Sequence, residues 1–331
     1  MEFPGVLRGQ ITFTLEARFT TKLAANLPAP ARMPKLRSAI NCPEMNATAE
    51  MLPSAAKVAE TRVIKAKRGL RAIDFQELWR YRELFWLLSW RNVLIRYKQT
   101  YLGIAWAVLQ PFLTMVVFSV IFGQIGKFPT KGAPYPVLVF VALLPWQFFA
   151  NALSESSNSL VSAQNMISKI YFPRLIIPAS AALSGCVDFL ISVVLLFAIM
   201  LWYHVPFTIN LLLLPVFFLV AFIASLAMGF WFSALNVKYR DVKYVVPFIV
   251  RMGFFISPVG FLSDKAGQWL GWYSTLDPLV GVIDGFRWCV LGPNFEPYWP
   301  GFWSGLAVVL VLLVTGAYYF RSTEKTFADV I

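Results

Sequence analysis

The sequence predicts an all-α integral membrane protein. We expect six transmembrane helices, an N-terminal cytoplasmic amphipathic interface helix, and a re-entrant external hairpin before the last span. Of the 331 residues, 58% are hydrophobic and only 14% are charged, whereas a typical soluble domain is about 25% charged. The apolar residues gather into six blocks, and the basic residues gather on one flank of them, with 17 of the 29 Lys and Arg in residues 1–103. This combination is typical of a chain that crosses a membrane and keeps its basic flank in the cytoplasm.

The first 68 residues differ in composition from the rest. They are rich in Pro, Ala and small polar residues, as in "LPAPARMPKL", and show no sustained apolar period. Such a composition predicts a disordered N-terminal extension over residues 1–68. No apolar stretch follows its basic residues, so it does not resemble a secretory signal. Two interpretations stay open: a true tail, or an upstream extension before a start at Met51.

The predicted interface helix covers about residues 74–99, "DFQELWRYRELFWLLSWRNVLIRYKQ". Apolar and aromatic residues recur at helical spacing, and basic residues interrupt them. The segment is too charged to span a bilayer, and its two faces suit a helix that lies in the membrane interface. The alternative is an ordinary amphipathic helix on a soluble core, but nothing downstream in the sequence offers such a core.

The six apolar blocks are the predicted spans. The first begins abruptly after the basic "RYKQT" and carries no charge over 20 residues, enough to cross about 30 Å of hydrocarbon. The fifth is shorter and contains Pro247, Arg251 and Pro258. The predicted spans are residues 104–123, 136–153, 175–201, 211–235, 246–262 and 302–320.

Between the fifth and sixth spans, "LDPLVGVIDGFRWCVLG" is apolar but short and broken by charges, which favours a re-entrant or interfacial hairpin. Lys and Arg flank alternate span ends, and this places both termini in the cytoplasm and residues 263–300 outside. In that external segment Lys265 and Arg287 are offset by acidic residues. The expected location is therefore the cell inner (plasma) membrane, with several spans and with membrane lipid as a partner.

Several classes of site are excluded by composition. One histidine and three distant cysteines offer no metal site, and no GxxxxGK[ST] phosphate loop is present. We expect no catalytic residue, no bound metal or cofactor, and no nucleic-acid partner. Asp188 and Arg251 are the ionisable residues well inside apolar blocks, which makes them functional candidates. The alternatives are a structural Asp–Arg pair or snorkelling to an interface.

Two polar cytoplasmic loops are candidates for docking a partner, although simple connections of positive charge would look the same. The first is predicted as a short polar helix over about Ser154–Lys169, and the second is "LNVKYRDVKYVVP" at Leu235–Pro247. The candidate docking residues are Asn158, Gln164, Asn165, Met166, Lys169, Lys238, Arg240 and Asp241.

Five motifs resemble the transmembrane permease subunit of type-2 ABC (ABC-2) exporters for O antigen, capsule or teichoic acid polysaccharides. They are "RYKQTYLGIAWAVLQP" (Arg96–Pro111), "PYPVLVFVALLPWQFF" (Pro134–Phe149), "KIYFPRLIIP" (Lys169–Pro178), "ALNVKYRDVKYVVPF" (Ala234–Phe248) and "GVIDGFRWCVLG" (Gly281–Gly292). The resemblance covers about residue 69 to the C-terminus, so residues 69–331 are expected to form the ABC-2 type transmembrane domain.

The resemblance implies a homodimer joined to two copies of a cytoplasmic ABC ATPase subunit, with ATP and Mg²⁺ bound by that partner. This chain would perform no chemistry and would export a lipid-linked glycan. The two polar loops would couple it to the ATPase. A glycan path needs aromatic faces that suit sugar C–H surfaces; a belt of lipid-facing aromatics is the alternative. The channel candidates are Trp106, Tyr135, Trp146, Phe148, Phe149 and Trp231.

The sequence departs from the family pattern at three places in the resembling region: Tyr101, Arg251 and Gly260–Phe261. Arg251 stands where the family usually has an uncharged residue. Two other classes of function stay open. One is an ABC-2 permease that exports drugs or small lipids, and the other is an unrelated secondary transporter or membrane enzyme. The sequence does not identify the sugar or its linkage.

Overall fold

The computed structural model describes residues 79–98, 103–167, 169, 172–264, 270–324 and 327. All of them belong to the second of two compact units of the chain, Lys67–Ile331. Every regular element within these ranges is a helix, in agreement with the predicted all-α fold. The predicted extension over residues 1–68 and residues 74–78 and 99 of the predicted interface helix lie outside the described residues.

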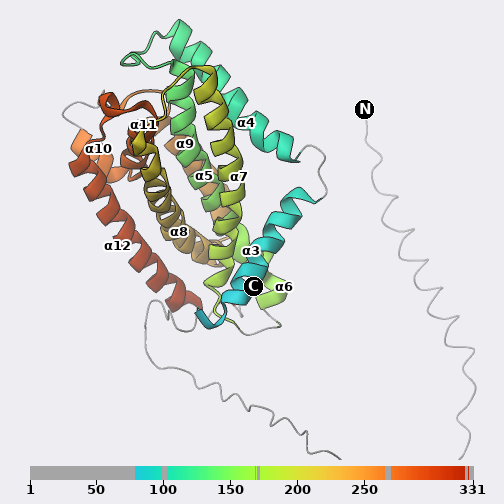
Figure 1. Cartoon of the computed structure of the whole chain (residues 1–331). Coiled ribbons are helices and arrows are strands. Elements are labelled where there is room, and N and C mark those ends of the chain that lie inside the picture. Colours follow the sequence, from blue (N-terminus) through green and yellow to red (C-terminus); the bar gives the residue numbers. More distant parts are fainter. Residues whose placement is uncertain are drawn as a thin grey trace, which may run out of the picture. The chain divides into compact units, whose positions relative to one another are not determined.

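The long helices pack side by side around α5, which contacts α7, α8, α9 and α11 (Figure 1). Figure 1 also shows α10 and α11 at one end of this bundle and α3 and α6 at the other. In chain order the helices are α3 (Arg82–Tyr97), α4 (Gly103–Phe118), η1 (Ser119–Ile125), α5 (Tyr135–Ser162), α6 (Gln164–Ile167), α7 (Ile176–Trp202), η2 (Ile209–Leu213), α8 (Leu214–Lys238), α9 (Val242–Ile256), α10 (Leu270–Leu276), α11 (Leu279–Leu291), η4 (Pro293–Phe295) and α12 (Trp299–Thr323).

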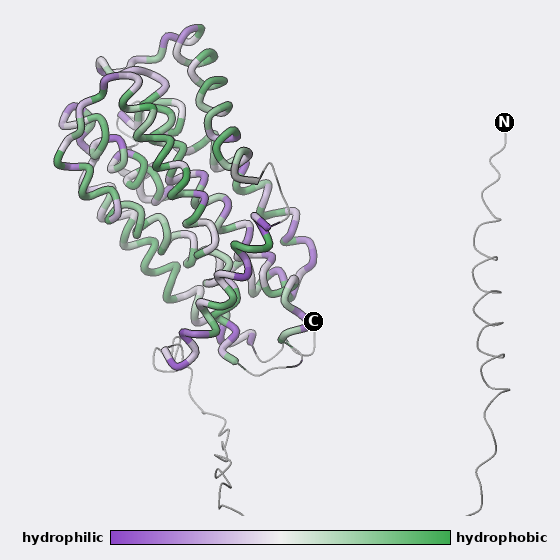
Figure 2. The backbone as a smooth tube through the Cα atoms, turned by 45° about the vertical axis from the view of Figure 1, so that its right-hand side comes forward, coloured by the Kyte–Doolittle hydropathy of each residue, from purple (hydrophilic) through white to green (hydrophobic). Residues whose placement is uncertain are grey.

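Five helices in the described ranges are long and apolar enough to cross a membrane. Hydrophobic residues run along them, and hydrophilic residues concentrate towards the ends of the bundle (Figure 2). These helices coincide with the first, second, third, fourth and sixth predicted spans. Their bounds are Ala105–Ile125, Tyr135–Ser162, Ile176–Trp202, Ile209–Lys238 and Trp299–Thr323.

The fifth predicted span, residues 246–262, corresponds to the shorter helix α9. This helix has 15 residues and ends at Ile256, just before Ser257 and Pro258. Its length is about 22 Å at 1.5 Å per residue, below the roughly 30 Å of a hydrocarbon core. Because Pro258 has no backbone N–H to continue the helix, the last residues of the predicted span form a non-helical segment instead.

The second span is longer than predicted. Helix α5 continues from the apolar block through Ser154 to Ser162, where a separate short helix was expected. The polar side chains bond to carbonyl groups of their own helix: Ser157 Oγ donates to Ser154 O at 2.8 Å, and Ser162 Oγ to Asn158 O at 3.0 Å. These bonds satisfy the hydroxyls without opening a loop. The only separate helix in the predicted polar segment is therefore α6, which has four residues and follows the end of α5.

The charges of the predicted external hairpin are not displayed on a loop surface. Arg287 and Asp284 of α11 are buried, with 1% and 8% of their side chains exposed. Arg287 donates to the carbonyl oxygens of Val259 and Phe261 at 3.1 and 3.0 Å, and Ser263 Oγ donates to Asp284 at 2.5 Å. The pair therefore fastens the segment after α9 to α11. Because the two opposite charges lie three residues apart on one helix, each offsets part of the cost of burying the other.

Two glycines let α11 enter the bundle. A Cβ at Gly285 would lie 2.2 Å from the ring of Phe217 on α8, and a Cβ at Gly281 would lie 2.9 Å from the backbone of Phe302 on α12. The 13 residues of α11 are almost all buried among neighbouring helices. This helix is about 20 Å long, too short to cross the hydrocarbon core.

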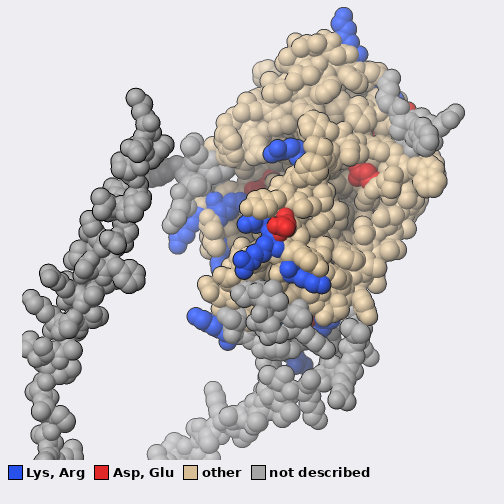
Figure 3. Space-filling view, turned by 180° about the vertical axis from the view of Figure 1, so that it is seen from behind, with Lys and Arg blue, Asp and Glu red and all other residues tan. Residues whose placement is uncertain are grey.

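Basic side chains gather unevenly on the face seen in Figure 3. Most of the Lys and Arg side chains in this view lie in its lower half, towards the end that carries α3 and α6. The surface above is largely uncharged.

Candidate functional site

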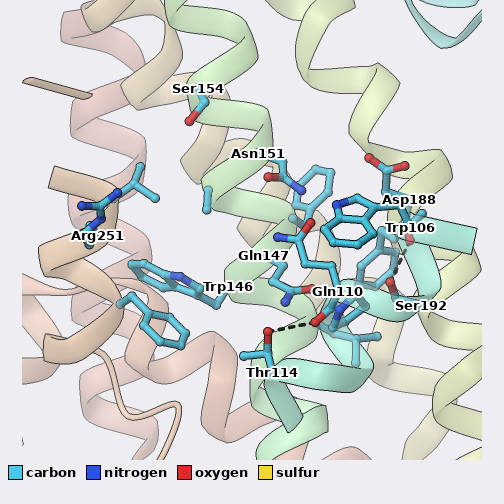
Figure 4. A pocket seen from close by; sticks show the side chains of 18 of the residues that line it. Trp106, Gln110, Thr114, Trp146, Gln147, Asn151, Ser154, Asp188, Ser192 and Arg251 are labelled. Carbon is cyan, nitrogen blue, oxygen red and sulfur yellow. Dashed lines mark hydrogen bonds between the residues drawn. The ribbon is translucent and has the colours of Figure 1, made fainter. Parts of the chain in front are cut away.

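A cavity of about 1020 Å³ opens between α4, α5, α7 and α9, with the last residues of α3 at its edge. Three of its walls, α4, α5 and α7, belong to helices long and apolar enough to cross a membrane, yet several polar side chains face the cavity (Figure 4). This size lies at the upper end of small-molecule sites, which are about 300–1,000 Å³. The cavity is the candidate functional site.

The polar wall consists of three short stripes, one on each of three helices. Residues four or seven apart share a helix face, so each stripe points into the cavity as a unit. The stripes are Gln110 and Thr114 on α4, Gln147, Asn151 and Ser154 on α5, and Asp188 and Ser192 on α7.

Of these seven residues, sequence analysis identified only Asp188. The signal that would have found the others is an amide or hydroxyl repeated at helical spacing inside an apolar span. The amides of Gln110, Gln147 and Asn151 make no side-chain hydrogen bond to any residue that the structure describes. They are therefore free to bond to a ligand that enters the cavity.

Three of the six predicted channel aromatics line this cavity: Trp106, Trp146 and Phe148. Trp106 is 57% exposed, whereas Trp146 and Phe148 are buried in its wall. Trp146 packs against α9, where a Cβ on Gly253 would lie 2.8 Å from the indole. Whether these rings contact a substrate stays a prediction.

The other three predicted channel aromatics lie outside the lining. The hydroxyl of Tyr135 donates to Gly260 O at 2.7 Å inside the core. Phe149 is buried behind Trp146, with ring centroids 5.9 Å apart. Trp231 stacks on Tyr319 at 4.7 Å and so joins α8 to α12.

Asp188, one of the two predicted intramembrane charges, is paired with residues of α3. The Arg96 guanidinium and the Tyr97 hydroxyl both donate to its carboxylate, and Arg96 also binds Glu155 of α5 at 2.7 Å. Burial and the bond to Asp188 hold the pKa of the Tyr97 phenol well above its ordinary value, so the phenol keeps its proton and remains a donor. An Asp–Arg pair therefore forms, and its arginine comes from α3.

Arg251, the other predicted intramembrane charge, has a different environment. It lies on α9 in the cavity wall, and its side chain is exposed. Figure 4 shows it on the side of the cavity opposite Trp106 and Asp188. No ion pair or hydrogen bond joins its guanidinium to another described residue.

The predicted docking residues lie near one end of the bundle. Gln164, Asn165 and Met166 form α6, which Lys169 follows, while Asn158 belongs to the last turns of α5. Lys238 ends α8, and Arg240 and Asp241 form the turn before α9.

The two docking segments are joined by Asn236, a residue that sequence analysis did not identify. Its Nδ2 donates to Ser157 O at 2.8 Å and to Asn158 Oδ1 at 3.1 Å, which links the end of α8 to the end of α5.

Across the described parts of the chain, no group of three or more His, Cys, Asp or Glu is arranged to hold a metal ion.

Comparison with known proteins agrees with this arrangement. The family described as ABC-2 type transporter matches residues 83–291, from α3 to the end of α11. The chain is 27% identical over 264 residues to the O-antigen export system permease protein RfbA of Myxococcus xanthus, which covers 77% of this chain and 98% of that protein.

Two further relatives carry related names. An O-antigen export system permease protein RfbA of Klebsiella pneumoniae is 24% identical over 252 residues, 75% of this chain and 95% of that protein. The polysialic acid transport protein KpsM of Escherichia coli is 23% identical over 245 residues, 71% of this chain and 91% of that protein. The family match spans more than half of the sequence and includes every wall of the cavity. The chain is thus a multi-pass membrane protein that belongs to the ABC-2 type transporter family.

Proposed function

We propose that this chain is the permease subunit of an ATP-driven transporter that exports a lipid-linked polysaccharide of the O-antigen, capsule or teichoic acid class across the inner membrane. The observation that carries the proposal is the cavity, whose wall combines unbonded amides with aromatic rings inside membrane-crossing helices. Sugar hydroxyls match the amides, and sugar C–H faces match the rings. The names of the related proteins favour the same class of cargo.

The proposed transporter contains two copies of this chain. Helices α4 and α9 border the cavity and also expose large apolar side chains, among them Phe112 and Val116 on α4 and Phe248 and Phe255 on α9. A second copy packed against this face would cover the apolar side chains and close the cavity into a path shielded from lipid. The two cavities would then face each other across the dimer axis.

The proposed topology has six crossings, with both termini in the cytoplasm. Helix α9 and the segment after it together make the fifth crossing, and α10 with α11 forms the re-entrant external hairpin. Helix α3 lies in the cytoplasmic interface, where its exposed Trp86 and Trp90, and Trp79 just before it, meet the lipid headgroups. Residues 69–331 form the transmembrane domain in this proposal.

The proposed coupling element is the end of the bundle that carries α6 and the α8–α9 turn. Two copies of a cytoplasmic ABC ATPase dock there and bind ATP and Mg²⁺, while this chain performs no covalent chemistry. The support is the joint position of the two segments, which Asn236 links by hydrogen bonds. Closure of the ATPases on ATP would then move α5 and α8 together.

The test is export in proteoliposomes. The purified chain, together with its proposed ABC ATPase partner, is reconstituted with a fluorescent lipid-linked polysaccharide, and protection of the glycan from an added glycosidase is measured. ATP should drive protection, and an ATPase variant unable to hydrolyse ATP should abolish it. ATP-driven movement of a drug or small lipid without movement of the glycan would favour the alternative cargo. Transport driven by an ion gradient without ATP would overturn the proposal.

A further inference from the structure

We propose that Arg251 binds an anionic group, a carboxylate or a phosphate, on the polysaccharide as it passes through the cavity. This inference rests on the proposed function and specifies the cargo further: it requires an acidic group on the glycan repeat or on the lipid anchor. The guanidinium presents donors in a planar fork that matches both oxyanions in two-point contacts.

The charges of the cavity favour an anion. Arg96, Asp188 and Arg251 are the charged side chains among the described residues that line it. Arg96 is engaged by Asp188 and by Glu155. Arg251 has no such partner in the described ranges, so it leaves the cavity with an uncompensated positive charge.

The position of Arg251 on α9 favours cargo over a bilayer headgroup. It is the tenth residue of the helix, about 14 Å along the axis from Val242. Its neighbours at the i−4, i+3 and i+4 positions, Pro247, Phe254 and Phe255, line the same cavity, so this face of α9 borders the cavity. A cation within an apolar block is costly unless it reaches a partner. The cavity is the place from which a partner can arrive.

The surroundings of Arg251 suit a sugar that carries the charge. Trp146 of α5 packs its indole against Gly253 of α9, the helix that carries Arg251. An aromatic ring therefore lies against that helix. Gln147 and Asn151 supply unbonded amides on α5. An acidic sugar could therefore present its anion to α9 and its hydroxyls to α5 in one pose, whereas a phospholipid headgroup would leave the amides unused.

The experiment measures the apparent KM for export in the proteoliposome assay with two substrates on the same diphosphate carrier: a glycan with one carboxylate per repeat and a neutral glycan of equal length. The variants are Arg251→Gln, which removes the charge, and Arg251→Lys, which keeps the charge without the fork. Arg91→Gln, at an exposed arginine of α3, is the matched control. The membrane level and elution profile of each variant are checked first.

We expect Arg251→Gln to raise the apparent KM by about tenfold, the loss of one charge-assisted contact. Arg251→Lys should lie between it and the wild type, and Arg91→Gln should match the wild type. An effect confined to the carboxylated glycan assigns the anion to the repeat, whereas an equal effect on both substrates assigns it to the diphosphate anchor. Both outcomes support the inference.

Unchanged KM values for both substrates in Arg251→Gln would overturn the inference while leaving wild-type export, and hence the proposed function, intact. So would a defect that changes with the phospholipid composition of the liposome and not with the substrate, because Arg251 would then serve the bilayer. Should Arg251→Gln fail to fold, the wild type is assayed with soluble competitors. An oligosaccharide that carries a carboxylate or a terminal diphosphate must then inhibit export more strongly than a neutral one of the same length, and equal inhibition by all three would refute an anion site.

Discussion

Asp188 lies in the middle of an apolar helix, and its environment explains why it is tolerated there. Its carboxylate accepts donors from Arg96 and Tyr97, and this bonding compensates for removing the charge from water. Because Arg96 also reaches Glu155, one guanidinium joins α3 to both α5 and α7. The two charged residues of the predicted spans therefore differ: Asp188 forms an ion pair with Arg96, whereas Arg251 has no ionic partner among the described residues.

We predict that Asp188→Asn weakens the attachment of α3 and lowers the stability of the purified chain by about 1–3 kcal/mol, since Arg96 loses an ionic partner in a half-buried place. Thermal unfolding is followed with a thiol-reactive dye, because Cys289 is buried and Cys186 is partly buried in the fold.

The control for this prediction is a double-mutant cycle with Arg96→Gln. If the two residues act through their contact, the double variant should be less destabilised than the sum of the single variants. Strictly additive effects would show that the ion pair contributes nothing to stability.

Among the single elements, α11 depends on a close contact between its glycines and the neighbouring helices. Gly285 faces Phe217 so closely that any side chain would displace the ring. We predict that Gly285→Ala destabilises the chain by about 1–3 kcal/mol, as overpacking in a filled core does. The same dye-based unfolding measurement reports it.

Gly271 of α10 is the matched control, because nothing lies within 4 Å of a Cβ added there. Ala at that exposed helical position should be neutral or slightly stabilising. Equal effects of the two substitutions would mean that helix propensity, and not the contact with Phe217, sets the outcome.

Helix α6 is part of the proposed coupling element, so disrupting it should uncouple transport from ATP hydrolysis. Replacing Asn165 with Pro and Met166 with Asp removes a backbone donor and adds a charge at the proposed contact with the ATPase. Because α6 lies beyond the end of α5, the membrane-crossing helices should still insert. We expect normal membrane levels with loss of export and of substrate-stimulated ATP hydrolysis, measured on the reconstituted complex.

The ATP hydrolysis of the complex with the α6 variant is compared with the basal hydrolysis of the isolated ATPase subunit. Export at the wild-type rate would remove α6 from the coupling proposal. The turn that contains Lys238, Arg240 and Asp241 would then be the better candidate.

The elements that sequence analysis predicted best are the long apolar ones. Predicted and observed starts agree within one to three residues for α4, α5, α7, α8 and α12, because a continuous apolar run of this length has few alternatives. The end of α5 was missed because Ser and Asn usually signal a loop, whereas here they bond to their own helix. The burial of Arg287 was missed because its partners, the carbonyl groups of Val259 and Phe261, become neighbours only in the folded chain.

For the site, sequence analysis found the residues whose chemistry is unusual in any membrane span, Asp188 and Arg251. It did not separate Trp106 and Trp146, which line the cavity, from Trp231, which joins two helices. Aromatic residues are common in every environment of a membrane protein, so only the packing distinguishes them. The amides of Gln147 and Asn151 carry a clearer signal, because an unpaired amide in an apolar helix needs a reason to be there.

For the whole molecule, the proposed topology makes a direct prediction. In a variant without its native cysteines, a cysteine at Asn294 should react with a membrane-impermeant maleimide in intact cells, because it lies between α11 and α12. A cysteine at Ser322, near the end of α12, should react only after permeabilisation. Labelling of Ser322 from outside intact cells would contradict cytoplasmic termini.

The continuity of α5 has a mechanical consequence. Pro145 removes one backbone hydrogen bond and is the natural bending point of the helix. From Pro145 to Ser162 the helix forms an arm of about 26 Å, and Asn151 stands about 9 Å along it. A sideways shift of about 3 Å at the outer tip would therefore move Asn151 by only about 1 Å. In the proposed transporter the arm would therefore act as a reducing lever, in which a large displacement of the far end of α5 becomes a small displacement of the Asn151 amide.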